Sequence, residues 1–122
     1  MAKFKKKLPK HFYCELFMEN FYFFKDFSFK EFCDYLKSTM GFVVNAPPSC
    51  KGKFYELVND DGFNCYVLWV DSSSDTSVLV HESCHAATAI LSSKGHRLDP
   101  ENDELFAYYT GLIFRKYNDG EV

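Results

Sequence analysis

The sequence predicts an α+β fold in which a small, mostly antiparallel sheet packs against helices. Aromatic and β-branched runs separated by turn residues indicate strands, and apolar residues at helical spacing indicate three helices. A chain of 122 residues suits one domain with one modest core. We therefore expect a single domain over residues 1–122, with residues 1–10 as a basic, flexible N-terminal tail.

Three segments have the composition of strands. Residues 11–24 are rich in Phe and Tyr and predict one or two strands, with a hairpin turn near Glu19-Asn20. A helix would also accept this composition. Residues 54–58 and 64–70 predict a second hairpin, joined through the turn sequence at residues 59–62.

The first helix is marked at both ends by local signals. Ser28 and Glu31 have the spacing of a capping box, and Gly41 is a typical C-terminal stop. Between them, apolar residues recur at helical spacing: Phe29, Phe32, Leu36 and Met40.

Two further helices are expected in the second half of the chain. The polar segment 71–75 offers several N-caps for a helix that should end at Lys94-Gly95. Asp99-Pro100 supplies an N-cap and a proline at the first helical position, which predicts a last helix from about residue 100 to about residue 117.

Composition excludes several classes of protein. Hydrophobic residues make up 47% and charged residues 25%, which is typical of a soluble globular chain, and the net charge of −3 argues against a nucleic-acid partner. No apolar run approaches the length of a membrane span, and the lysine-rich start is not followed by an apolar signal segment. Five scattered cysteines without a C-x-x-C pair predict free thiols in a reducing cytoplasm.

The strongest chemical signal is His81-Glu82-Ser83-Cys84-His85, a His-Glu-x-x-His pattern. On a helix, residues four apart lie on one face, so the two imidazoles can share a Zn²⁺. Glu82 would then flank the metal and reach its bound water. The alternative is a chance match, in which a half-buried His pair is hydrogen-bonded to backbone carbonyls. Cys84, within the same pattern, is more typical of a small buried core residue than of a ligand.

A catalytic zinc needs three protein ligands and one open position, and one helix face cannot surround a metal. Glu104 lies near the start of the last helix, which an antiparallel arrangement would bring back to the first ligands. The helix that carries His85 ends just before His96, and by then the chain has advanced about 15 Å from His85. His96 could therefore reach the metal only if the loop folded back sharply. The downstream candidates are His96, Asp99, Glu101, Asp103 and Glu104.

The two-part pattern, His81 to His85 followed by Asn102-Asp103-Glu104-Leu105-Phe106-Ala107-Tyr108, resembles the gluzincin metallopeptidases, the thermolysin and aminopeptidase-like group. It is also similar to short phage-encoded proteins with the same pair of motifs. The resemblance covers about residues 64–117 and implies a zincin-like fold. It assigns Glu82 as general base, and as zinc ligands His81, His85 and Glu104.

Two features depart from the family pattern. Thermolysin-like enzymes carry an Asp one turn after the ligand Glu, where this chain has Tyr108. Its hydroxyl would bond a ligand or donate to the oxyanion, or else Tyr108 is a half-buried core residue. Gluzincins also usually carry a further lobe, so we expect a shallow cleft, or one completed by a second copy or a host protein.

The sequence therefore predicts a zinc-dependent hydrolase, a peptidase of the cytoplasm (the host cytoplasm for a phage-encoded chain), with a peptide or protein substrate. Residues 65–70 are expected to form an edge strand that pairs with an extended substrate, or an ordinary core strand, and both can hold at once. One alternative function is a zincin-like binding module that keeps zinc for stability. A second is an amidase or deaminase-type hydrolase of a small molecule.

Overall fold

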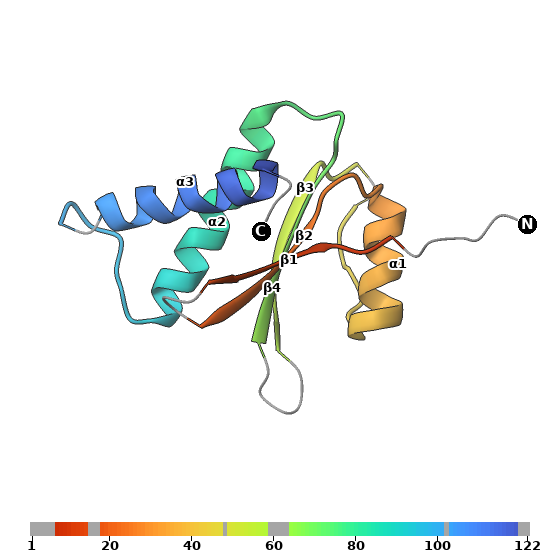
Figure 1. The fold of residues 1–122 in the computed structure, drawn as a ribbon, viewed down its shortest axis with the longest axis horizontal. Coiled ribbons are helices and arrows are strands. Elements are labelled where there is room, and N and C mark those ends of the chain that lie inside the picture. The colour runs from red at the N-terminus through yellow and green to blue at the C-terminus, as the bar shows by residue number, and fades with distance from the viewer. Residues whose placement is uncertain (1–6, 15–17, 48, 59–63, 102, 120–122) are drawn as a thin grey trace, which may run out of the picture.

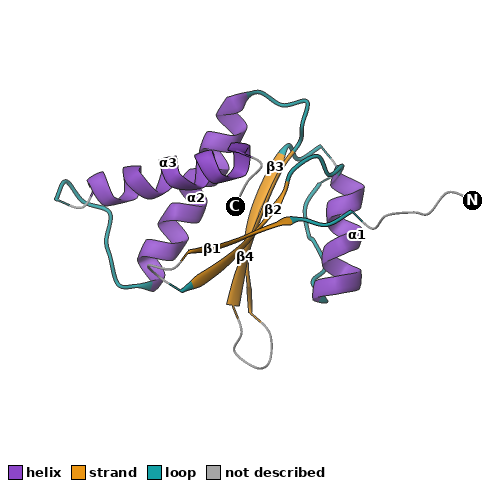
Figure 2. Cartoon of the chain, viewed as in Figure 1, coloured by secondary structure: helices purple, strands orange, loops and turns teal. Residues whose placement is uncertain are grey.

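The computed structural model describes residues 7–14, 18–47, 49–58, 64–101 and 103–119. These residues form an α+β structure with a four-stranded mixed sheet and three helices, which confirms the predicted class (Figure 1). The elements are β1 (Lys10–Cys14), β2 (Glu19–Phe24), α1 (Phe29–Met40), β3 (Gly52–Val58), β4 (Asn64–Val70), α2 (Thr76–Ser93) and α3 (Asp103–Asp119). Helix α1 covers one face of the sheet, and α2 and α3 cover the other (Figure 2).

The strand order is β1-β2-β4-β3. Strands β1 and β2 are antiparallel, as are β3 and β4, but β2 and β4 run parallel with Phe21 opposite Tyr66. The expectation that residues 65–70 form an edge strand is therefore wrong, because β4 has a neighbour on each side. The physical reason is burial, since every residue from Cys65 to Val70 is buried, as in strands covered on both faces.

Alternate residues of β4 enter two separate cores. Tyr66, Leu68 and Val70 join the cluster under α2 and α3. Cys65, Val67 and Trp69 join the cluster under α1, where the indole N–H of Trp69 donates to the carbonyl of Phe27 at 2.7 Å. The sheet is thus a partition between two apolar layers.

Strands β1 and β2 pair antiparallel, as predicted for a first hairpin, but Glu19 and Asn20 are not its turn. Glu19 and Asn20 are the first residues of β2, and Glu19 is opposite Cys14. They belong to the strand because Phe21 and Phe23, at the next alternate positions, both enter the core under α2 and α3. The predicted turn at residues 59–62 lies outside the described residues.

Residues 7–10 belong to the described fold, although the sequence predicted a tail over residues 1–10. Lys10 is already the first residue of β1, and the ammonium of Lys7 forms an ion pair with Glu31 at 3.1 Å. Residues 7–10 are therefore part of the fold as described.

The local signals for α1 are confirmed. The Ser28 side chain accepts from the Glu31 N–H at 3.1 Å, the Glu31 carboxylate accepts from the Ser28 N–H at 2.8 Å, and Gly41 ends the helix in the left-handed region. Helix α3 begins at Asp103 rather than near Pro100. The Asp99 carboxylate accepts from the Glu101 N–H at 2.9 Å in the turn that precedes it.

All five cysteines are free thiols, as expected. In the part of the chain that the structure describes, no helix is long and apolar enough to cross a membrane.

Candidate functional site

Helix α2 carries the His-Glu-x-x-His residues, and its two ends are where the sequence predicts them. Asp75 is the N-cap, and its carboxylate accepts from the Ser77 N–H at 2.8 Å. Lys94 is the C-cap, with its N–H bonded to the carbonyls of Ile90 and Leu91 at 3.2 Å.

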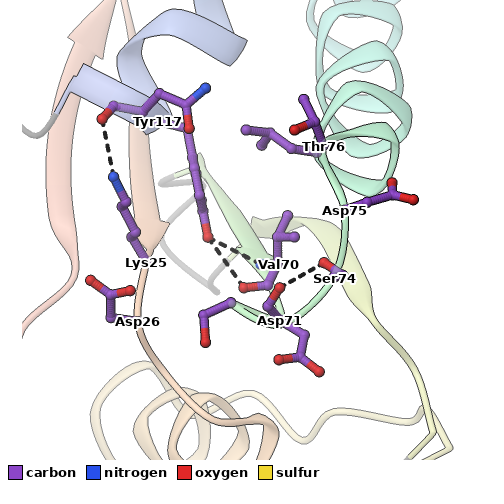
Figure 3. Close-up of a pocket in the computed structure, with 11 residues that line it drawn as sticks. Lys25, Asp26, Val70, Asp71, Ser74, Asp75, Thr76 and Tyr117 are labelled. Carbon is purple, nitrogen blue, oxygen red and sulfur yellow. Dashed lines mark hydrogen bonds between the residues drawn. The ribbon is translucent and has the colours of Figure 1, made fainter.

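The start of α2 is tied to the sheet and to α3. The buried hydroxyl of Tyr117 accepts from the Val70 N–H at 3.2 Å, and the Ser74 hydroxyl donates to the Asp71 carbonyl at 2.6 Å (Figure 3). These contacts surround a small cavity of about 190 Å³ between β4, α2 and α3. They fix where α2 leaves the sheet, and so where its histidines lie.

His81 and His85 are both exposed and lie together on one face of α2, as predicted. Their Nε2 atoms are 3.0 Å apart, with ring centroids at 4.6 Å and ring planes at 81°. Two nitrogens that each lie about 2.1 Å from a tetrahedral zinc would be about 3.4 Å apart. A small rotation of the rings would therefore give two ligands of a metal site. The alternative of a half-buried pair bonded to backbone carbonyls does not describe these exposed, converging rings.

Glu82 lies at the inner edge of this pair. It is 9% exposed, and it packs so closely on β3 that a Cβ at Gly52 would come within 3.0 Å of its Cγ. Burial raises the pKa of Glu82, against the opposing charges of His85, His81 and Lys53. A carboxylate that holds its proton more tightly than usual, beside two potential ligands, suits a general base.

The structure does not bring a third ligand to the pair. Among the described residues no three His, Cys, Asp or Glu side chains are grouped so that they could hold a metal ion. The carboxylates considered as third ligand are all exposed, namely Asp99, Glu101, Asp103 and Glu104. His96 lies in the loop after α2, with its backbone N–H bonded to the Leu91 carbonyl at 2.9 Å.

The position of Glu104 has a simple cause in the rotation of α3. The buried face of this helix is formed by Phe106, Tyr109, Ile113 and Tyr117. At 100° per residue, Glu104 lies about 160° around the helix from Phe106. Its carboxylate is thus on the side opposite the core, and the three-ligand zinc site stays a prediction.

Two further expected residues lie elsewhere than the sequence suggested. Tyr108 is 60% exposed, with its ring edge against Tyr109 at a centroid distance of 5.5 Å, so it is not a half-buried core residue. Cys84 is exposed, not a buried core residue, because it lies on the outer face of α2. No interaction within the described residues joins Tyr108 to the His pair.

Sequence reasoning missed the contribution of β3. A Cβ at Gly52 would meet Val78 and Glu82, and Lys53 is close enough for its charge to act on Glu82. The pattern on α2 carries no signal for these residues, because their position depends on the register of β3 with β4. The larger described cavity, of about 790 Å³, lies on the α1 side of the sheet, and none of the predicted site residues lines it.

Comparison of the chain with protein-family models, with curated proteins and with solved structures finds no match.

Proposed function

We propose that this protein is a zinc-dependent hydrolase, a peptidase in which Glu82 activates the attacking water. The observation that supports the proposal is the convergence of the His81 and His85 Nε2 atoms at 3.0 Å on an exposed face, with the buried Glu82 carboxylate beside them. Two imidazoles that can bind a metal, beside a carboxylate that can take a proton, are groups that metal-assisted hydrolysis uses.

His81 and His85 would hold the metal. Glu104 is the third ligand that the resemblance to gluzincins implies, and it could take that role only if the first turn of α3 changed its orientation. Bound zinc would lower the pKa of its water and polarise the carbonyl under attack. Glu82 would accept the water's proton as the new C–O bond forms, and then deliver it to the leaving amine.

Strand β3 is the natural place for a peptide substrate. It is an edge strand, it pairs only with β4 among the described strands, and it begins beside Glu82. An extended peptide added to this edge would form backbone hydrogen bonds with β3 and pass beside the histidines. We therefore propose that an extended substrate pairs with β3, and not with residues 65–70.

One observation favours a second candidate, a binding module that keeps a metal without cleaving its partner. In the described residues the His pair lacks a third ligand. A site with two protein ligands could recruit its remaining donors from a partner protein.

A mixed peptide library separates the two candidates. Protein purified without chelator and loaded with zinc is incubated with the library, beside the Glu82→Gln variant. We expect cleavage by the wild-type protein and none by the variant, because the amide is nearly isosteric but cannot take the proton. A zinc-loaded wild-type protein that leaves every peptide intact would support the binding module.

A further inference from the structure

We propose that the peptide bound along β3 carries a lysine or arginine opposite Glu56. This inference rests on the proposed function, since it specifies the substrate of the same site. Glu56 would act as a specificity residue through charge complementarity, on the face of the sheet that carries α2.

The register of the sheet places Glu56 on that face. Glu56 is opposite Tyr66, and Tyr66 belongs to the core under α2 and α3. Phe54, two residues earlier on β3, stacks on Tyr66 at 5.7 Å, and side chains two apart in a strand share a face. The pKa of Tyr66 is raised mainly by burial, and the charges of Glu19 and Glu56 act in the same direction.

The Glu56 carboxylate is available for a partner. It is exposed, and none of the ion pairs formed by the described residues includes it. The nearby acid Glu19 differs, because Lys94 neutralises it at 2.9 Å. Glu56 thus places on the exposed edge strand a negative charge that forms no ion pair with another described residue.

The other charged residue of β3 does not compensate it. Lys53 is opposite Trp69, so its side chain leaves the strand on a different face from Glu56. Its charge acts on Glu82, near the start of the strand, and it forms no ion pair with Glu56. On the α2 face, a peptide strand would meet Phe54 and then Glu56. Opposite charges in directly facing positions of neighbouring strands are favourable, and like charges are not.

The distance along β3 gives the position of the basic residue. Gly52 is the residue beside Glu82, and Glu56 is about 13 Å further along the strand. The lysine or arginine should therefore lie about four residues from the peptide position beside Glu82.

The test measures binding separately from cleavage, in the zinc-loaded Glu82→Gln protein. The probes are labelled octapeptides of alternating Thr and Val in which one central residue is Lys, Gln or Glu. Each is titrated by fluorescence anisotropy at low salt against proteins that also carry Glu56→Lys or Glu56→Gln. Asp34→Asn is the matched control, because Asp34 lies on α1, where it forms an exposed ion pair with Lys30 at 2.8 Å.

We expect the Lys peptide to bind about threefold to fivefold more tightly than the Glu peptide. The preference should reverse with Glu56→Lys, disappear with Glu56→Gln and persist with Asp34→Asn. A preference that survives Glu56→Lys, equal binding of all three peptides, or no binding of any of them would overturn the inference. If one of these outcomes is found but the peptide library is cleaved, the proposed hydrolase function is retained. If binding depends on Glu56 but the library is not cleaved, the inference about Glu56 is supported and the hydrolase function is refuted.

Discussion

Replacing Gly52 by alanine should disturb the contact between β3 and α2 on which the site depends. A Cβ at this position would lie 2.9 Å from Cγ1 of Val78, 3.0 Å from Cγ of Glu82 and 3.4 Å from the Trp69 carbonyl oxygen. Val78 is β-branched and has little rotamer freedom in a helix, so α2 itself must move away from the sheet. Overpacking of this kind costs about 1–3 kcal/mol.

The backbone contribution opposes part of that cost. Alanine restricts the unfolded chain more than glycine does, which returns about 0.4–1 kcal/mol. We therefore expect Gly52→Ala to lower the free energy of unfolding by about 1–2 kcal/mol, measured by urea denaturation with an unchanged m-value. Gly52→Ala should also weaken hydrolysis, because Glu82 is displaced with α2.

Gly111→Ala is the matched control for this substitution. Gly111 lies within α3, where a Cβ would meet nothing within 4 Å. Alanine there should stabilise the protein by about 0.5–1 kcal/mol. Adding Val78→Ala to Gly52→Ala should recover part of the lost free energy of unfolding, because it removes the shortest contact of the new Cβ. The coupling energy between the two substitutions should be about 0.5–3 kcal/mol. A Gly52→Ala protein as stable as the wild type would refute this packing argument.

Two further predictions concern buried groups. Because the pKa of Glu82 is raised in the fold, the folded state holds this proton more tightly than the unfolded state, and stability is lost as pH rises through the folded pKa. The free energy of unfolding of Glu82→Gln should therefore exceed that of the wild type by more at pH 7 than at pH 4, measured by urea denaturation without zinc. An equal difference at both pH values would contradict the raised pKa of Glu82. Tyr117→Phe should cost about 1–3 kcal/mol, because the buried Val70 N–H loses its acceptor, and a cost near zero in the same assay would exclude that role.

The elements that the sequence predicted well are those set by local chemistry. Ser28, Glu31 and Gly41 define α1 by contacts within a few residues, and Asp75 does the same for the start of α2. The pairing of His81 with His85 also follows from helical spacing alone. None of these features depends on the rest of the fold.

The errors came from long-range geometry. The internal position of β4 depends on its parallel pairing with β2, which is distant in sequence and leaves no local pattern. The role of Glu104 as a ligand stays a prediction, and its outward orientation depends on which side of α3 is buried. The apolar spacing of Phe106, Tyr109 and Ile113 could have shown that side in advance.

Zinc binding to the His81–His85 pair tests the central claim most directly. Calorimetric titration of the chelator-treated protein should give one zinc per chain. Zinc affinity should fall at least about a hundredfold in each of three variants, His81→Ala, His85→Ala and Glu104→Ala. This is more than the usual loss on removing a residue that only hydrogen-bonds a metal ligand. His96→Ala and the neighbouring exposed control Asp103→Ala should bind as the wild type does. Zinc retained by Glu104→Ala alone would remove the gluzincin assignment but keep the pair, whereas absent zinc binding, or binding unchanged in His81→Ala and His85→Ala, would contradict the account.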